Sequence, residues 1–527
     1  MTKEFIYIHS KFYDLDAIKK THPGGYLKIF ECIGNEKDCT ALFESSHAMK
    51  DLKNILEMMK VYEIKPENYA EFGITAETVS ERKLLPKSNF DSYHELTNEI
   101  KQEFKTEKNY KVNKIWYLKL SVLFFLYLIC YFKGLIKNVS GNTLFYENYL
   151  FAFLAGILWL NFGFSTLHDA SHYGFFSNRK KISIDDYDKE KNLFNFIPEL
   201  LAELFSYTLA IGEEGKLKKT SINKANEDQN NLIKKQNNNE NQNEPNLNNN
   251  NNNKKIIFGF LQKSENTLNN KNDILNSLWQ GWALWNSYIW FKHHTYAHHS
   301  FTGIFGLDPD LIHLLPLARK TRYKTYIIKS LIAIQQKTIW LILIFLPGLY
   351  LGQVINYFIC AFKGSFLKVS IPQVFRKTPF LELLLYLSSA LLLIFNNNYI
   401  CVYFYFIGLN LMYAICIVPD HDTFESAIEN EKQTDDWCEM QIRKSGNFCE
   451  QSFFMTDLCG GINYQIQHHL FPTIAHCHYK RIAGRVKEFC LRKGFPYVSK
   501  NSLAEVYDSY MKTIAYAAVD EAEQKEM

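Results

Sequence analysis

Three histidine clusters have spacings that could bring several imidazole nitrogens to one point. They are HDASH, HHTYAHH and QIQHH, and their histidines at this spacing are His168, His172, His294, His298, His299, His468 and His469. Residues three or four apart lie on one face of a helix, so each cluster could direct two or three nitrogens the same way. Imidazole is a ligand of iron, zinc, copper and nickel, and the clusters therefore point to transition-metal chemistry.

The number of histidines predicts two metal ions rather than one. A lone pair of histidines four residues apart is weak evidence, because such pairs arise by chance. Three clusters beside apolar segments of membrane length are stronger evidence, since ionisable groups at membrane depth usually have a functional reason. A structural zinc ion needs only four ligands, and the 11 cysteines include no CxxC pair that would favour an iron–sulfur cluster.

Apolar segments flank the clusters and must position them. Two precede the first cluster, at about 115–135 and 144–164, and three follow the second, at 338–360, 379–396 and 399–418. Clusters that meet at one site must lie on one side of the membrane, so an even number of crossings must separate the second cluster from the third. Segment 338–360 contains Pro347 and is expected to lie in the interface or to re-enter. Four crossings remain, and the lysines before the first predict a cytosolic N-terminus.

The chain divides into parts of different composition. Residues 1–78 predict a small mixed domain, 79–114 a charged linker of helical character, 115–500 the membrane domain and 501–527 a C-terminal tail. Within the membrane domain, the asparagine-rich stretch 213–273 has little to bury and is expected to be a disordered insertion without a chemical role. The net charge of +4, without a block rich in lysine or arginine, argues against nucleic acid as a partner.

The three clusters, in this order around hydrophobic segments, resemble the membrane fatty-acid desaturases. The phrases LDPDL, DDWCEMQIRKSGNF and GGINYQIQHHLFP are similar too, and Gln465 at the head of the third cluster resembles the front-end branch of that family. The resemblance covers roughly residues 115–500 without the insertion. It implies an all-α integral membrane domain with about four transmembrane helices and a cytosolic, histidine-rich di-iron cap.

The same resemblance implies which residues hold the two iron ions. They are the seven histidines above, together with His421 and Gln465. His421 stands after Asp420, where the family usually has asparagine or threonine, and Gln465 is expected to ligate weakly or to act through water. His293, which is one place off the spacing, and His476 and His478 are expected around the centre or in structural roles.

The N-terminal part carries a second resemblance. The motif HPGG, His22–Gly25, is followed by His47 in TALFESSH, and this pairing resembles cytochrome b5 over about residues 5–75. The resemblance implies a small α+β domain whose two histidines are the axial ligands of a b-type haem. Its implied haem-binding residues are His22, Pro23, Gly24, Gly25, Phe43 and His47.

Together the two resemblances imply a front-end acyl-lipid or acyl-CoA desaturase of the Δ5/Δ6 type, which inserts a cis double bond into a polyunsaturated acyl chain. O2 is the implied oxidant, and an NAD(P)H-dependent cytochrome b5 reductase is the implied electron source. Because the haem domain is fused to the membrane domain, the haem would be present at a high effective concentration beside the di-iron cap. The implied location is the endoplasmic reticulum, as a multi-pass protein among membrane lipids with both soluble parts in the cytosol. A sphingolipid long-chain-base desaturase and a non-catalytic haem-binding membrane protein are alternatives, and regiochemistry, chain length and carrier stay open.

Overall fold

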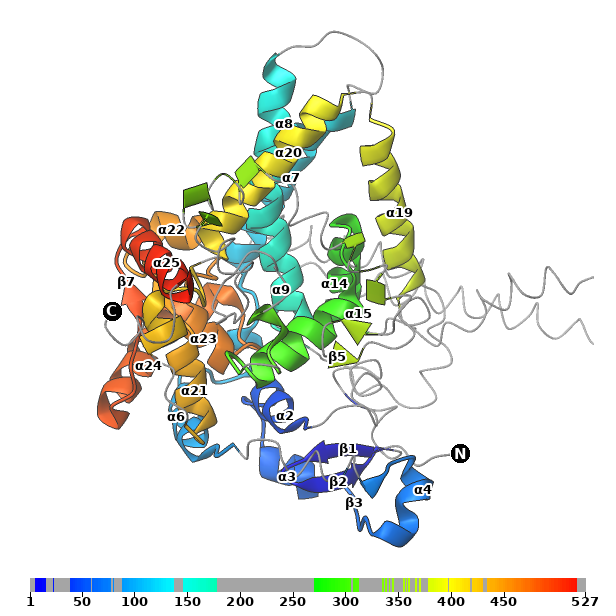
Figure 1. Ribbon diagram of the computed structural model, residues 1–527, viewed down its shortest axis with the longest axis vertical. Coiled ribbons are helices and arrows are strands. Elements are labelled where there is room, and N and C mark those ends of the chain that lie inside the picture. Colours follow the sequence, from blue (N-terminus) through cyan, green and yellow to red (C-terminus); the bar gives the residue numbers. More distant parts are fainter. Residues whose placement is uncertain are drawn as a thin grey trace, which may run out of the picture.

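The computed structural model shows a multidomain protein, with a small α+β domain at one end and a helical domain at the other (Figure 1). It describes residues 5–15, 38–76, 88–136, 146–177, 270–311 and 378–518, apart from 58, 305–306, 397, 418 and 430–433. It also describes His22, Val79 and scattered positions between 334 and 370. Most of the apolar segment 338–360, and the asparagine-rich stretch up to residue 269, lie outside the described residues.

The N-terminal domain is built on a three-stranded antiparallel sheet in the order β1-β2-β3. Its elements are β1 (Phe5–Ile8), β2 (Lys11–Asp14), α2 (Thr40–Ser46), α3 (Leu52–Glu57), β3 (Val61–Tyr62), η1 (Pro66–Asn68) and α4 (Tyr69–Phe72). His9 and Ser10 form the turn between β1 and β2, with φ angles of 47° and 61°. Two adjacent residues with positive φ give the tight turn whose twist matches a β-hairpin.

The segment that joins the two domains is part of the folded core over its described residues. It forms helix α6 (Asp91–Lys101) and the short η2 (Glu107–Tyr110). The apolar face of α6 packs against the C-terminal helix α24 (Tyr479–Lys493) in one buried cluster. The linker expected at 79–114 is therefore helical, and it is also a packed layer between the domains.

Three described helices are long and apolar enough to cross a membrane. The first joins α7 (Lys114–Tyr131) to η3 (Phe132–Ile136), the second joins α8 (Tyr146–Leu158), η5 (Trp159–Phe164) and α9 (Ser165–Ser171), and the third is α20 (Tyr399–Cys416). A fourth apolar helix, α19 (Phe380–Ile394), has only 15 residues, which is shorter than a straight crossing requires. Four crossings were expected, so the described residues supply three of full length and one short helix.

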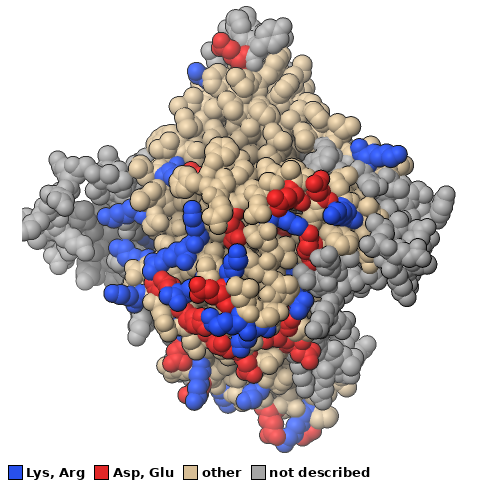
Figure 2. Space-filling model, turned by 90° about the vertical axis from the view of Figure 1, so that its left-hand side faces the viewer, with Lys and Arg blue, Asp and Glu red and all other residues tan. Residues whose placement is uncertain are grey.

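Charged side chains are distributed in keeping with these helices. On the face in Figure 2 the upper part of the molecule is nearly free of lysine, arginine, aspartate and glutamate, whereas all four gather on the lower part. The same upper part contains α7, α8, α19 and α20 in Figure 1. An apolar band above a charged region is the pattern of a protein that is partly surrounded by lipid.

Close packing of α8 against α20 holds two of the apolar helices together. A Cβ atom on Gly156 would lie 2.0 Å from the carbonyl oxygen of Tyr405, and one on Gly408 would lie 2.1 Å from that of Phe153. Only glycine permits such a close backbone approach, which is typical of helix pairs in membranes. Because α8 continues through η5 into α9, this contact also fixes the position of His168.

The remaining elements form the region between the apolar helices and the N-terminal domain. They are α14 (Lys271–Trp282), α15 (Ser287–Trp290), η6 (Phe291–His298), η7 (Pro309–Leu311), β4 (Ser365–Phe366), β5 (Val369–Ser370), η8 (Glu425–Glu429), α21 (Trp437–Lys444), β6 (Asn447–Phe448), α22 (Phe453–Leu458), α23 (Gln465–Leu470), η9 (His476–His478), α24, β7 (Ser499–Lys500) and α25 (Leu503–Ala518). The expected C-terminal tail thus contains a helix, α25.

Helix α14 begins inside the stretch expected to be an insertion. The Asn270 side chain caps the helix by accepting a hydrogen bond from the Asn272 backbone N–H. The Asn272 amide exchanges two hydrogen bonds with the Phe176 backbone, at 2.9 and 3.2 Å, and the Tyr173 hydroxyl donates to Asp273 at 2.7 Å. The last residues of the range 213–273 therefore connect α14 to the chain that follows α9, so the range expected for the insertion includes residues of the folded domain.

Candidate metal centre

The histidine clusters lie on three separate elements that meet where the apolar helices approach the N-terminal domain. Helix α9 and its C-cap carry the first cluster, η6 and its C-cap the second, and α23 the third, while His421 lies in the turn after α20. All nine expected ligands are buried, and none is more than 9% exposed. The structure thus brings together residues that are far apart in the chain.

The second cluster owes its geometry to a π-helix. Helix η6 repeats its hydrogen bonds every five residues rather than every four. Residues four and five positions after His294 therefore both return close to its face, and these residues are His298 and His299. In an α-helix the residues three and four positions on would do so and the residue five positions on would lie further round, so the wider helix explains how His294, His298 and His299 can serve one site.

One group of candidate ligands combines the first cluster with members of the other two. The ligand atoms of His168, His172, His294 and His468 all lie within 4.8 Å of one another. The Nε2 atoms of His168 and His294 are 2.9 Å apart. His299 Nε2 completes the ring, at 3.3 Å from His294 Nε2 and 3.0 Å from His468 Nε2.

A second group lies next to the first and includes His421. Its members are His298, His421 and His469. His421 Nε2 is 3.1 Å from His298 Nε2 and 2.9 Å from His469 Nε2, and the Gln465 amide nitrogen is 2.9 Å from the same atom. A third group, which contains His299, shares members with both. The structure therefore offers two adjacent positions for an ion, and His421 and Gln465 lie at the second.

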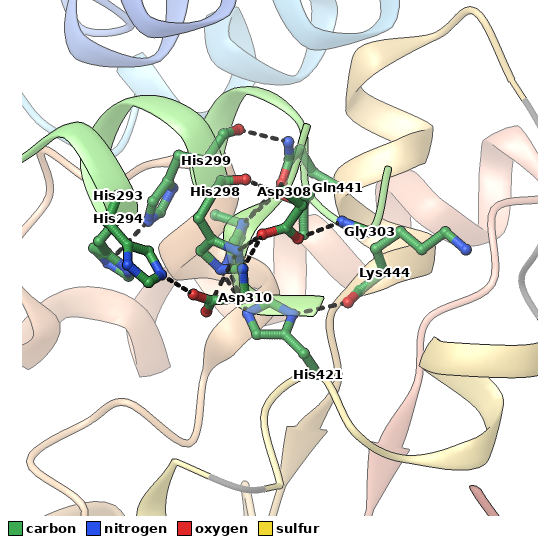
Figure 3. Close-up of polar contacts among 12 residues, drawn as sticks. His293, His294, His298, His299, Gly303, Asp308, Asp310, His421, Gln441 and Lys444 are labelled. Carbon is green, nitrogen blue, oxygen red and sulfur yellow. Dashed lines mark hydrogen bonds and ion pairs between the residues drawn. The ribbon is translucent and has the colours of Figure 1, made fainter. Parts of the chain in front are cut away.

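Hydrogen bonds behind the rings fix which nitrogen faces the centre (Figure 3). Three acceptors, the Asp308 carboxylate, the Gln441 amide oxygen and the Lys444 carbonyl oxygen, lie 3.1, 2.8 and 2.8 Å from the Nδ1 atoms of His298, His469 and His421. Oxygens of these kinds only accept, so each Nδ1 carries the proton and each Nε2 presents a lone pair to the centre.

The lone pairs fit metal ions. Unprotonated nitrogens 2.9–3.1 Å apart repel one another unless a cation lies between them. Neighbouring ligands of an octahedral ion with bonds of about 2.1 Å are about 3.0 Å apart, which matches this spacing. His172 Nε2 and Gln465 Oε1 are further donor atoms that are buried without a hydrogen-bond partner among the described residues. The donor set suits iron, copper, nickel or zinc.

The histidines of the centre are neutral, as metal ligands must be. Burial first, and then the neighbouring histidines, hold the pKa of His294, His299, His468 and His469 well below the ordinary value of 6.5. Neutral imidazoles bind metal without first having to release a proton, so the centre is ready for metal at pH 7.

Other histidines take the surrounding roles. His293 turns away from both groups, and its Nε2 lies 2.5 Å from Asp310. His476 Nε2 lies 3.0 Å from His168 Nδ1, behind the first group. His478 contacts the backbone oxygen of Lys111 at 2.8 Å instead. These contacts agree with the expectation that His293 lies around the centre and that His476 and His478 lie around it or have structural roles.

The supporting residues Asp308, Gln441 and Lys444 were not predicted. They lie in the phrases LDPDL and DDWCEMQIRKSGNF, which contributed to the resemblance. Those phrases were the available signal, but the order of residues does not show which imidazole each one contacts. Only the folded arrangement supplies that pairing.

The N-terminal domain holds a second pair of facing imidazoles. The rings of His22 and His47 have centroids 5.8 Å apart, and the Phe43 ring lies 4.7 Å from that of His47. Two imidazoles that share one iron, with bonds of about 2.0 Å, would have centroids roughly 6 Å apart. His47 Nδ1 lies 2.8 Å from the Phe43 backbone oxygen, so Nε2 is left for a metal. Burial lowers the pKa of His47 and keeps it neutral. Pro23, Gly24 and Gly25 lie outside the described residues.

A largely apolar pocket opens onto the centre. Its walls include Phe164, Trp285, Trp290, Leu409 and Tyr413, together with histidines of both groups and Gln465. The empty space in and in front of the pocket, open solvent included, amounts to about 1100 Å³. Apolar walls that lead to a few buried polar groups suit a long apolar ligand.

The fold and the site define the class of protein: a helical membrane protein with a buried polyhistidine centre and a small N-terminal domain with two facing imidazoles. Comparison with known families agrees. Residues 2–65 match the cytochrome b5-like haem/steroid binding domain, and residues 259–501 match the fatty acid desaturase family. The chain therefore joins a cytochrome b5-like domain to a fatty acid desaturase domain, which confirms both resemblances. The second match begins after His168 and His172, so the first cluster stands outside it.

Curated relatives are consistent with these matches. The sn-1 linoleoyl-lipid 6-desaturase of Synechocystis sp. is 26% identical, over 44% of this chain and 64% of the relative. The acyl-lipid (8-3)-desaturase of Physcomitrium patens is 28% identical, over 40% of this chain and 46% of the relative. The probable Delta(5) fatty acid desaturase C of Dictyostelium discoideum is 22% identical, over 92% of this chain and 85% of the relative. The chain thus spans about half to two thirds of the first two. No solved structure matches.

Proposed function

We propose that the protein is a front-end acyl-lipid or acyl-CoA desaturase of the Δ5/Δ6 type. In this proposal it inserts a cis double bond into a polyunsaturated acyl chain, on the carboxyl side of an existing one. The observation that carries the proposal is the two adjacent groups of buried histidine nitrogens beside an apolar pocket. The relatives named as a 6-desaturase, an (8-3)-desaturase and a probable Delta(5) desaturase support the substrate class.

The residues divide the work of the proposed reaction. The nine expected ligands would hold two iron ions, which when bound supply the activation of O2. The aromatic and aliphatic walls would bind the acyl chain and keep water from the centre. Asp308, Gln441 and the Lys444 carbonyl hold Nδ1 protons and so keep three imidazoles turned toward the metal positions.

The overall reaction sets what the haem domain must deliver. Two C–H bonds of the acyl chain break and one C=C bond forms, which releases two electrons and two protons. Reduction of O2 to two water molecules takes four electrons and four protons. Two further electrons must therefore arrive, and we propose that they come one at a time through the haem held by His22 and His47. An NAD(P)H-dependent cytochrome b5 reductase is the proposed supplier of these electrons.

The proposed topology follows from the same requirement. The haem domain and the histidine centre must lie on one side of the membrane for electrons to pass between them. We propose that both are cytosolic and that the protein resides in the endoplasmic reticulum. The three long apolar helices and the short α19 would then form the membrane part.

Two alternative functions make different predictions. A sphingolipid long-chain-base desaturase would use the same centre on a different chain, so its product would appear in long-chain bases. A non-catalytic haem-binding membrane protein would have no need of a complete ligand set. All nine expected ligands are present, buried and grouped, which favours an enzyme.

Expression in a cell that makes no polyunsaturated lipids tests the proposal. The cells are fed candidate polyunsaturated acids, and gas chromatography of acyl chains and long-chain bases identifies new double bonds. We expect a new cis double bond on the carboxyl side of an existing one, and no product from the His468→Ala variant. A product found only in long-chain bases would favour the sphingolipid alternative, and no product from protein that carries haem and iron would contradict the proposal.

A further inference from the structure

The N-terminal domain rests on the desaturase domain through helix α2. Ala41 and Ala48, which lie in and just after this helix, belong to the same buried cluster as Phe90, Tyr93 and Trp437 of the desaturase side. Figure 1 shows α2 between the small sheet and the region that holds the histidine centre. The helix also leads directly to the haem ligand His47, which is its C-cap. The position of α2 therefore fixes the position of one axial ligand.

A buried carboxylate lies in this contact. Glu44 of α2 is only 2% exposed, and its two oxygens lie 2.7 Å from His9 Nε2 and 2.8 Å from His94 Nε2. His9 belongs to the β1–β2 turn, whereas His94 belongs to α6. Phe90 packs against both imidazoles, with ring centroids 6.0 and 6.4 Å away. One carboxylate thus joins the sheet, α2 and the connecting helix.

The electrostatics agree with a charged clamp. Burial alone would raise the pKa of Glu44, but the hydrogen bonds from His9 and His94 lower it overall. The hydrogen bond to Glu44 raises the pKa of His94, so the contact favours the charged form of both side chains. A buried carboxylate that has lost one of its partners would be left with an uncompensated charge, so both contacts matter to the packing.

The other end of α2 approaches the metal centre itself. The Asp38 carboxylate accepts a hydrogen bond from the Thr40 backbone N–H at 2.9 Å, and so organises the start of the helix. The Asp38 backbone oxygen accepts a hydrogen bond from the Tyr296 hydroxyl at 3.2 Å. Tyr296 lies on η6, between the ligand candidates His294 and His298. Helix α2 therefore runs from the contact with the histidine-bearing helix to the haem ligand.

We propose that Glu44 is a positioning residue: with His9 and His94 it clamps α2 onto the desaturase domain and so holds the haem at a fixed place beside the metal centre. This inference rests on the proposed function for its purpose, which is to pass the two electrons of each turnover from haem to metal. The haem domain is then a docked part of the enzyme rather than a module that moves freely on its linker. A haem domain that is held in place does not have to diffuse to the metal centre before each electron transfer. Its effective concentration at the metal centre is therefore as high as tethering can make it.

The test compares three variants of the full chain, loaded with haem and iron, in lipid nanodiscs. Glu44→Gln removes the charge of the clamp and keeps its shape. His94→Ala removes the imidazole that α6 contributes to the clamp; this residue lies outside the haem domain and its side chain is 45% exposed, so the replacement should leave the haem domain intact. Glu57→Gln is the matched control, because Glu57 is an exposed carboxylate of the same domain whose ion pair with Lys53 is long, at 3.8 Å.

Two measurements decide the outcome. Loss of a hydrogen bond to a charged group should speed amide hydrogen exchange in residues 40–46 and 91–101 by about tenfold or more in both clamp variants. The rate at which reduced haem is reoxidised by O2 and acyl substrate should fall with it, with kcat lowered, KM for the acyl substrate unchanged and the haem spectrum unaltered. Glu57→Gln should behave like the parent in both measurements.

The two arms separate this inference from the proposed function. Exchange and haem reoxidation equal to the parent in both clamp variants would overturn the role of Glu44. A parent that makes no desaturated product would overturn the proposed function instead, while the exchange measurement would still decide whether Glu44 holds the haem domain in place.

Discussion

At the scale of single residues, the structure separates histidines that look alike in the sequence. His293 and His294 are neighbours in one cluster, yet only His294 points into a group of ligand candidates. His293 pairs with Asp310 instead. The spacing of the cluster predicted this difference, because His293 lies one place off the repeat. The supporting contacts could not be predicted, because they join side chains that only folding brings together.

Alanine substitution of these two neighbours should have unequal effects. We expect His294→Ala to lose at least one of the two iron ions and all product, because its Nε2 lies 2.9 Å from that of His168 in the first group. His293→Ala should keep both ions and much of the activity. Metal content per protein, measured by mass spectrometry alongside product formation, checks this. Equal metal content in the two variants would show that the grouping of nitrogens does not identify the ligands.

Gln465 calls for a separate prediction. Its amide nitrogen lies 2.9 Å from His421 Nε2, and its Oε1 is buried without a hydrogen-bond partner among the described residues. An amide oxygen is a weaker ligand than imidazole, so we propose that Gln465 ligates weakly or orients a water molecule or His421. We expect Gln465→His to hold iron yet lose turnover. Full activity in Gln465→Ala would contradict any specific role.

At the scale of elements, the segment expected to be a linker turns out to be a packed layer. Ion pairs join α6 and the residues after it to α24, among them Glu95 with Lys493 and Glu103 with Arg481. The spacing of apolar residues can predict a helix at 91–101. It does not show which other helix the apolar face of that helix contacts. The π-helical form of η6 was equally hidden, because helix type depends on what the histidines contact.

The clamp between α2 and α6 should depend on pH. His94 has a raised pKa, so its contribution is present below its ordinary pKa of 6.5 and is lost as the pH rises through the raised value. Glu44 has a lowered pKa, so its contribution is present above 4.5 and is lost in acid. The other titratable or charged groups that interact with these two among the described residues include His9, His47, Asp91, Tyr93 and Lys101.

Hydrogen exchange measures this dependence. After correction for the intrinsic rate, residues 91–101 should exchange more slowly at about pH 6.5 than at a pH above the raised pKa of His94, where that side chain has lost its proton. The His94→Ala variant should show a smaller difference between the two conditions. Equal protection of the parent at both values would mean that the charge of His94 adds nothing to the contact.

At the scale of the whole molecule, the sequence predicted the two kinds of domain that the family matches confirm, and the structure groups the predicted ligands, whose role in metal binding stays a prediction. The sequence did not show where the asparagine-rich stretch ends, because Asn270 and Asn272 are of the same residue type as the stretch before them. In the structure these asparagines cap α14 and bind the Phe176 backbone. The composition of a segment shows whether it has enough apolar residues to form a core. It does not show which single polar side chains make specific hydrogen bonds.

Two deletions should therefore behave differently. Removing residues 213–265 should leave product formation largely intact, since that stretch contains no candidate ligand. Removing residues 213–273 also removes the cap of α14 and its bonds to Phe176 and Tyr173. Loss of such a cap and of buried hydrogen bonds costs about 1–3 kcal/mol each, so this variant should be less stable and less abundant. Melting temperature and product formation check both, and equal stability would contradict the assignment of the boundary.

The distances along the chain between the ligands bear on how the centre is made. His168 and His294 are 126 positions apart, and a further 169 positions separate His299 from His468. Most of the chain has therefore been synthesised before the last ligands exist. All of the ligands become buried together only when the fold is completed. In the proposed di-iron centre, the iron ions would therefore bind late, when the fold is completed. Their later exchange should follow the slow opening of the protein rather than the free concentration of the metal.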